Sequence, residues 1–139
     1  MLISLFFSLA LFSQAKSTAT LEITFTGIRS EKGVITAGLK SSPEGWPRKS
    51  EKDFKWDKKE LRDGNLVVEI HGLTPGIYAL TAMDDENDNY ELDLLRGETF
   101  GFSMNPKVRL SAPKFVDCSF EIKNDLTKIE IRLRKKGEE

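Results

Sequence analysis

The chain has 139 residues and a formal net charge of -1, with 21 basic and 22 acidic side chains. This length is typical of one domain that buries its own core without disulfides or structural metals. The balanced charge argues against nucleic acid or an anionic membrane surface as the principal partner, because such surfaces need a basic excess. The single cysteine, Cys118, excludes an internal disulfide and a thiolate metal cluster.

The first residues are predicted to form a signal peptide. Residues 2–12 are almost entirely apolar, and this run has the length of a signal-peptide core, whereas a membrane-spanning helix needs about 20 apolar residues. Small residues precede the cleavage site that we expect after Ala15, with Ala19 as the alternative. Residues 1–15 are therefore expected to be removed on export to the periplasm or the medium, leaving residues 16–139 as one domain.

Alternating apolar and polar residues predict strands in the first two thirds of the chain. Leu21, Ile23 and Phe25 alternate with polar side chains, which is the period of a half-buried strand. The link at residues 29–33 ends in glycine and predicts an antiparallel hairpin between the first two strands. A Pro-Gly pair predicts a tight turn with a positive φ at Gly76. By these patterns we expect strands at residues 21–26, 34–39, 66–71 and 77–83.

The connection at residues 41–64 is long, polar and strongly charged. Long loops within a compact domain are commonly functional or contain a short edge strand. This loop contains both tryptophans, Trp46 and Trp56, together with Phe54. The two tryptophans are therefore candidates for a binding surface, and the alternative is that they pin the loop onto the edge of the fold.

The last third of the chain is expected to add further strands. Val116, Cys118 and Phe120 alternate in one phase, so the free thiol of Cys118 is expected to pack inward as a small hydrophobe. Residues 123–125 are a plausible hairpin turn. The added strands are expected at residues 107–110, as a short edge strand, and at residues 116–122 and 128–133. Without a convincing amphipathic helix, the chain is predicted to be all-β, a single antiparallel β-sandwich of about seven strands.

Oxygen-bearing side chains are dense between residues 84 and 98. A calcium loop supplies its ligands at alternate positions, and the residues at that spacing are Asp85, Asn87, Asn89, Glu91 through its carbonyl, and Asp93. Two positions depart from an EF-hand loop, because Tyr90 replaces the turn glycine and Arg96 replaces the bidentate glutamate. One interpretation is a weak Ca²⁺ site. The alternative is a turn in which the Asp and Asn side chains bind their own backbone.

Four segments of the chain together match a known pattern. They are L-T-P-G-I-Y-A at residues 73–79, D-E-N-D-N-Y-E-L-D at 85–93, G-F-S-M-N at 101–105 and A-P-K-F-V-D-C-S-F at 112–120. The chain thereby resembles an uncharacterised family of secreted bacterial proteins, domain of unknown function 2141, which implies a secreted sandwich without an assigned activity. It departs from the family pattern at Tyr90, Asp84 and Cys118, where glycine, histidine and alanine are common. The L-x-P-G-x-Y corner also resembles that of transthyretin-like and carboxypeptidase-regulatory-like sandwiches, an analogy of fold alone.

These features favour a binding module over an enzyme, and no catalytic residue is assigned. His71, the only histidine, lies in the outward phase of its strand, and the sequence around Ser103 is not a nucleophile elbow. We expect a secreted or periplasmic non-enzymatic binding or accessory module whose partner is a protein or glycan of the cell envelope. Phe102, Ser103 and Asn105 join the tryptophans as binding-surface candidates. The alternative is a small cell-envelope hydrolase that uses the acidic loop at residues 84–98. The basic residues near the C-terminus are expected to be a solvated tail.

Overall fold

A computed structural model describes residues 18–93, 95 and 97–138, so the predicted signal peptide at residues 1–15 lies outside the described residues. The described strands are β1 (Ala19–Thr26), β2 (Val34–Lys40), β3 (Lys52–Trp56), β4 (Leu66–Leu73), β5 (Gly76–Asp85), β6 (Phe100–Phe102), β7 (Phe120–Ile122) and β8 (Asp125–Arg132), and a short helix, α1, spans Phe115–Cys118. Within the same residues, no helix has the length and apolar character needed to cross a membrane.

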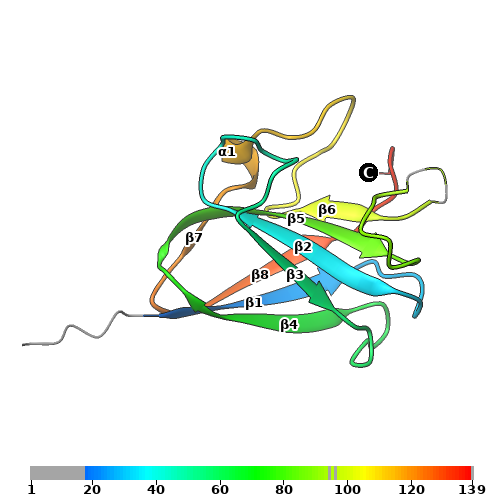
Figure 1. The fold of residues 1–139 in the computed structure, drawn as a ribbon, viewed down its shortest axis with the longest axis horizontal. Helices are drawn as coiled ribbons and strands as arrows, with labels where there is room; N and C mark the ends of the chain where they lie inside the picture. The colour runs from blue at the N-terminus through cyan, green and yellow to red at the C-terminus, as the bar shows by residue number, and fades with distance from the viewer. Residues whose placement is uncertain (1–17, 94, 96, 139) are drawn as a thin grey trace, which may run out of the picture.

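The strands form two sheets that face each other, which confirms the predicted all-β sandwich (Figure 1). One sheet has the order β4-β1-β8, and the other has the order β3-β2-β5-β6 with β7 beside β5. Five of the six described strand pairings are antiparallel, but β1 and β8 run parallel over eight paired positions, from Ala19 with Asp125 to Thr26 with Arg132. The sandwich is therefore mixed, where a purely antiparallel one was expected.

The predicted hairpin between the first two strands is wrong, because β1 and β2 belong to different sheets. Both edges of β1 are occupied, by β4 and β8, and both edges of β2 are occupied, by β3 and β5. The link between them crosses from one sheet to the other and buries Ile28, whose N–H donates to the Gly64 carbonyl at 3.1 Å. Gly33, at φ 73°, comes so close to β5 that a Cβ there would lie 2.0 Å from the Asp85 carbonyl oxygen.

The last third of the chain differs most from expectation. Residues 115–118 form α1 in place of a strand, and the predicted edge strand at residues 107–110 is absent from the described residues. Cys118 is buried as predicted, but it lies on the helical turn, and Val116 is exposed instead of sharing its face. The predicted final hairpin is also wrong, because β7 pairs with β5 whereas β8 pairs with β1.

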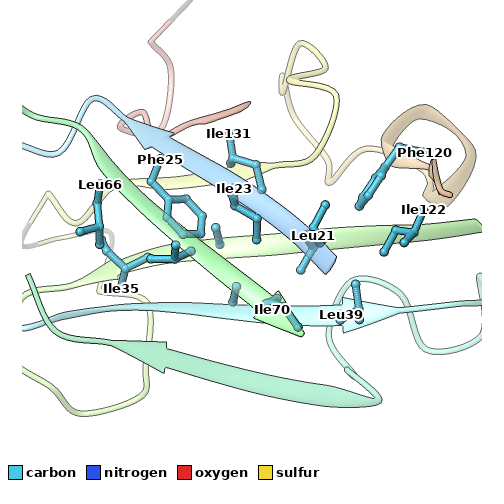
Figure 2. Close-up of a cluster of buried hydrophobic side chains, with 14 of the residues drawn as sticks. Leu21, Ile23, Phe25, Ile35, Leu39, Leu66, Ile70, Phe120, Ile122 and Ile131 are labelled. Carbon is cyan, nitrogen blue, oxygen red and sulfur yellow. The ribbon is translucent and has the colours of Figure 1, made fainter. Parts of the chain in front are cut away.

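The main core lies between the two sheets. Figure 2 shows apolar side chains of β1, β4 and β8 meeting those of β2 and β7, with Leu21, Ile23 and Phe25 all fully buried. A second cluster, formed by Ala79, Phe102 and Cys118, lies in the opposite phase of β5 and β6, on the outer face of the five-stranded sheet. Every residue of β2 is buried, in the outer phase as well as in the phase that faces the main core.

The corner between β4 and β5 is held by a tyrosine. The Tyr78 hydroxyl donates to the Thr74 carbonyl at 2.6 Å, which is the same kind of contact as the tyrosine corner of immunoglobulin-type sandwiches. The predicted positive φ at Gly76 is wrong: the residue with a positive φ is Gly72, at 72°, four positions earlier. Gly72 lies within β4, where the register with β1 shifts between the pairs Leu21–Ile70 and Ala19–Leu73, and Pro75 leads directly into β5.

Candidate functional site

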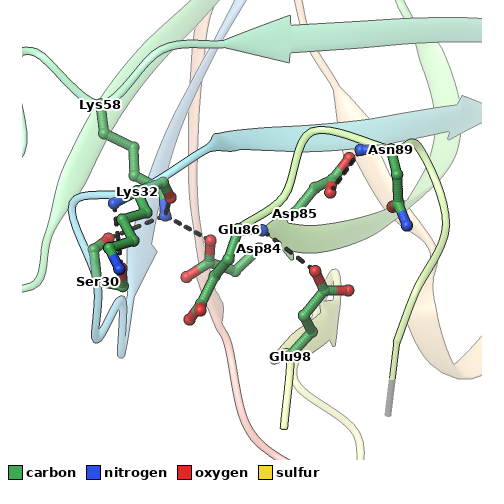
Figure 3. Close-up of polar contacts among 8 residues, drawn as sticks. All are labelled: Ser30, Lys32, Lys58, Asp84, Asp85, Glu86, Asn89 and Glu98. Atoms are coloured by element: carbon green, nitrogen blue, oxygen red, sulfur yellow. Dashed lines mark hydrogen bonds and ion pairs between the residues drawn. The ribbon is translucent and has the colours of Figure 1, made fainter. Parts of the chain in front are cut away.

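The acidic loop after β5 is organised by two buried carboxylates (Figure 3). Asp85, at the end of β5, accepts the backbone N–H groups of Asn89 at 3.1 Å and Tyr90 at 2.7 Å. Glu98 accepts the N–H of Glu86 at 3.2 Å and that of Asp93 at 2.7 Å. Asp85 thus binds two consecutive amides, whereas Glu98 binds amides from the two ends of the loop, and together they close it into a compact turn.

The remaining predicted calcium ligands bind the backbone or face solvent. The Asn89 side-chain oxygen accepts the N–H of Glu91 at 2.9 Å, and an Asp93 carboxylate oxygen accepts that of Leu95 at 3.1 Å. Asn87 and Glu91 are exposed. No three His, Cys, Asp or Glu side chains converge on a common point among the described residues. The geometry supports the alternative interpretation of a backbone-capping turn, and calcium binding stays a prediction.

Tyr90 takes a backbone conformation that glycine adopts more readily than other residues. Its φ is 64°, in the left-handed region that is costly for an aromatic residue. The ring lies 5.7 Å from the Lys55 ammonium of β3, and this ammonium also pairs with Asp88 at 2.5 Å. The hydrogen bond to Asp88 raises the pKa of Lys55. Strand β3 therefore holds the acidic loop from the side through one cation.

A buried ion pair closes the end of the sandwich beside this loop. The Lys58 ammonium and the Asp84 carboxylate lie 2.6 Å apart, and each side chain is only 2% exposed. Lys58 also donates to the Ser30 carbonyl at 2.9 Å and to the Lys32 carbonyl at 2.5 Å, so its three donors are all used. Burial raises the pKa of Asp84, and the hydrogen bond from Lys58 opposes that shift. The pair joins the β1–β2 link and the residues after β3 to the end of β5 (Figure 3).

No local pattern in the sequence predicts this ion pair. Lys58 stands in a run of charged residues that is typical of a solvated loop, and Asp84 follows a strand at the start of an acidic stretch. Only a long-range pattern, such as correlated change of the two positions among relatives, would have linked them.

A groove of about 430 Å³ lies on the outer face of the five-stranded sheet. Its floor is formed by Thr36 and Gly38 of β2 with Thr81 and Met83 of β5. The walls and rims come from β6, β3, the loop before β3 and the acidic loop, and comprise Phe100, Phe102, Asp53, Pro47, Arg48, Ser50, Tyr90 and Leu92. The groove therefore combines aromatic rings with hydroxyl and charged groups, as binding sites for small ligands do.

The two tryptophan candidates have different surroundings, and both pack against the body of the protein. Trp46 donates its indole N–H to the Pro113 carbonyl at 2.9 Å and lies 6.0 Å from the ring of Phe102. Trp56 stacks on Phe54 at 5.8 Å and packs against the main core. Neither tryptophan lines the groove. The position of Trp46 agrees with the alternative in which it pins its loop to the sandwich, whereas Trp56 belongs to the edge strand β3.

The candidates of the G-F-S-M-N segment are also built into the fold. Phe102 is mostly buried and contributes to one wall of the groove. Ser103 is fully buried, and its hydroxyl donates to the Cys118 carbonyl at 2.5 Å and accepts the Leu80 N–H at 2.9 Å. It therefore ties α1 to β5 and offers no exposed surface for a partner.

Asn105 substitutes for a neighbouring strand along β8. Its side-chain amide donates to the Glu130 carbonyl at 3.0 Å, and its oxygen accepts the Arg132 N–H at 2.8 Å. These are the two groups that an adjacent strand would bind, so the asparagine covers part of an open strand edge.

Gly101 meets a backbone constraint, because a Cβ there would lie 2.6 Å from the Arg132 carbonyl oxygen. The glycine lets β6 approach β8 closely. Next to it, the Phe100 N–H donates to the carbonyl of Arg134, two residues after the end of β8, at 3.0 Å. The residues of this segment therefore form the junction between the two sheets.

Comparison with known proteins identifies a family and nothing more specific. No curated protein and no solved structure matches the chain. A family model described as "Uncharacterized protein conserved in bacteria (DUF2141)" matches residues 23–130, which span the sandwich from β1 to β8. The chain belongs to this family.

Proposed function

We propose that the chain is an exported, non-enzymatic binding module of the bacterial cell envelope and that the groove is its ligand site. The observation that carries the proposal is the position of the groove. Six of its lining residues come from residues 83–105, the stretch that contains the acidic loop and the G-F-S-M-N segment; they are Met83, Tyr90, Leu92, Phe100, Gly101 and Phe102. A volume of about 430 Å³ is within the range of ligand pockets, roughly 300–1,000 Å³.

The chemistry of the groove suits a glycan or a short protein segment. The rings of Tyr90 and Phe100 offer apolar faces, and the hydroxyls of Thr36 and Thr81 together with Asp53 offer hydrogen-bonding groups close by. Such a combination recognises ligands that have apolar and polar sides. An accessory role in a cell-envelope assembly uses the same site and differs only in the partner.

The hydrolase alternative has weaker support. Asp85 and Glu98 each accept two backbone N–H groups, so their carboxylate oxygens are already engaged in holding the loop together. His71 has Thr20 Oγ1 at 3.2 Å from Nδ1 and Glu69 Oε2 at 3.2 Å from Nε2. These three side chains lie on an exposed strand surface outside the groove, where water is not excluded.

Export is part of the proposal, and the start of β1 supports the expected cleavage site. Cleavage after Ala15 leaves β1 whole. Cleavage after Ala19 would remove a buried residue that pairs with both Leu73 and Asp125. Mass spectrometry of the protein from the envelope fraction of its host should find a chain that begins at residue 16, and an intact Met1 there would contradict export by cleavage.

A lysine placed in the groove tests the binding site. Thr81→Lys in β5 extends a charged side chain over the floor, and Thr24→Lys makes the same change on β1, on the outer face of the other sheet. The parent and both variants are screened against an array of bacterial envelope glycans and against envelope proteins by chemical cross-linking. For every partner that the parent captures, Thr81→Lys should weaken binding by about tenfold or more while Thr24→Lys retains it.

Two results would contradict the proposal. Equal binding by the parent and Thr81→Lys would place the partner elsewhere on the surface. Turnover of a captured glycan that disappears entirely with a single carboxylate substitution at Asp85 or Glu98, in a variant that still folds, would favour the hydrolase, because removing a catalytic group abolishes rate steeply whereas binding declines gradually.

A further inference from the structure

The loop after β6 and the end of the chain together form a basic face. Residues 104–114 contain three basic side chains and no acidic one. The backbone of Phe100 bonds to that of Arg134 in both directions, at 3.0 and 2.9 Å, which brings this loop beside the C-terminal segment. Figure 1 shows the loop, coloured yellow to gold, projecting from the body next to the C-terminal end in red.

Two depressions mark this face. A small one, of about 40 Å³, is lined by Asn105 and Pro106 of the loop together with five cations, namely Arg109, Arg132, Arg134, Lys135 and Lys136. A shallower one, of about 340 Å³, shares Arg132 and Arg134 and adds Arg29 from the β1–β2 link. Cations from three separate parts of the chain therefore converge on one region.

The charge of the face is left largely uncompensated. The Glu138 carboxylate pairs with Arg29 at 2.6 Å and accepts the Lys135 N–H at 3.0 Å, and these contacts lower the pKa of Glu138. Among the described residues, the five cations of the small depression have no ion-pair partner. Arg134 Nε is in addition a buried donor without a hydrogen-bond partner in the described part of the chain. Such a donor is available to an acceptor atom from outside the chain.

The loop also presents a leucine to solvent. Leu110, directly after Arg109, is fully exposed. An apolar side chain on a protruding loop that is flanked by basic groups is typical of surfaces that contact lipid headgroups and the upper acyl region.

We propose that this face attaches the protein peripherally to an anionic phospholipid surface. Lipid phosphates would bind Arg132, Arg134 and the two lysines, and Leu110 would insert between headgroups. A free phosphate ion would fill the small depression but leave Leu110 and the shallower depression uncovered, whereas an extended lipid surface accounts for all three features. The overall charge of -1 does not prevent this attachment, since screening limits the influence of distant charges to about 8–10 Å.

Vesicle cosedimentation tests the proposal on the whole mature chain. The parent should bind vesicles of phosphatidylcholine with about one third phosphatidylglycerol and should not bind pure phosphatidylcholine. Removing a basic residue lowers partitioning by about fivefold, so the charge-reversing pair Lys135→Glu and Lys136→Glu should lower it by about 25-fold or more. Leu110→Ser should lower it by about tenfold.

The matched control reverses two exposed lysines outside both depressions, Lys49→Glu with Lys123→Glu, and changes the net charge by the same amount. This control should stay within about threefold of the parent. An equal loss in the two charge-reversed proteins would overturn the proposal, because binding would then depend on net charge alone. Absence of binding at low salt would also overturn it, as would complete displacement by inorganic phosphate together with no effect of Leu110→Ser.

Discussion

The buried pair of Lys58 and Asp84 should be strongly coupled in stability. Each side chain is 2% exposed and the charged groups lie 2.6 Å apart, so removal of one partner leaves the other charge in a place that water does not reach. Breaking a buried pair in this way costs about 3–5 kcal/mol. If the two losses were independent, Asp84→Leu and Lys58→Met together would cost about 6–10 kcal/mol.

The double variant is expected to lose far less than that sum. It contains no isolated buried charge, and its main penalty is the loss of the lysine donor to the carbonyls of Ser30 and Lys32, about 1 kcal/mol each. We therefore expect the double variant to lie about 2 kcal/mol below the parent or closer to it. The coupling energy would then be about 4 kcal/mol or more.

Urea denaturation followed by tryptophan fluorescence measures all four proteins of the cycle. A variant that is unfolded without urea can be studied with Asp84→Asn in place of the leucine, since the amide oxygen still accepts from Lys58. The exposed pair of Lys59 and Asp57, 3.8 Å apart, is the control, and Lys59→Met should leave the midpoint almost unchanged. Additive losses in the buried cycle would refute the reasoning, as would single variants that cost less than about 1 kcal/mol.

Three further predictions concern the junction and the loop. Asn105→Ala should cost about 1 kcal/mol in urea denaturation, because the Glu130 carbonyl and the Arg132 N–H lose partners at an edge that water can reach, and Asn105→Asp should cost less because it keeps one of the two bonds; equal stability of all three proteins would refute the edge-covering role. Burial raises the pKa of Cys118 to about 12, so the folded protein holds this proton more tightly than the unfolded chain. From about pH 9 to 12 the parent should therefore lose about 1.4 kcal/mol more per pH unit than Cys118→Ala, and rapid labelling of the native thiol would contradict its burial. Calcium binding by the acidic loop is expected to be weak, about 10⁻⁴ to 10⁻³ M, so calcium at ~10 times the Kd should add about 1.4 kcal/mol; a Tm that is the same in calcium and chelator, for the parent and for Tyr90→Gly, would leave only the capping role.

The first strands were predicted correctly because apolar and polar residues alternate strictly in their sequences. In β4, Leu66, Val68 and Ile70 are buried and the residues between them are exposed, because one face of a strand packs on the core and the other meets solvent. Pairing was not predictable in the same way. The link that ends at Gly33 fits a hairpin or a crossing between sheets equally well, and the choice depends on which strands fill the edges of β1.

The short helix, the buried ion pair and the basic face were not predicted from the sequence, each for a different reason. Helix α1 has four residues, too few to show a helical period, and Val116, Cys118 and Phe120 imitate strand alternation by chance. The ion pair joins residues 26 positions apart, and each looks like an ordinary surface charge in its own segment. The basic face was not predicted, because the net charge sums the side chains of the whole chain. The fold separates Arg109 and Arg132 from the acidic loop residues that offset their charge in this sum.

The acidic loop shows why ligand spacing alone did not distinguish a metal site from a turn. Alternate carboxylate and amide side chains suit a calcium loop because they point toward a common centre when the backbone curls around it. The same curl turns backbone N–H groups inward, and Asp85 and Glu98 bind four of them. A cation and an N–H group compete for the same oxygen lone pairs, so the outcome depends on burial and on how tightly the loop closes. Glu98 favours the turn, because it lies shortly before β6 and accepts the N–H groups of Glu86 and Asp93, which closes the loop. It stands outside the alternate spacing that predicts the calcium ligands.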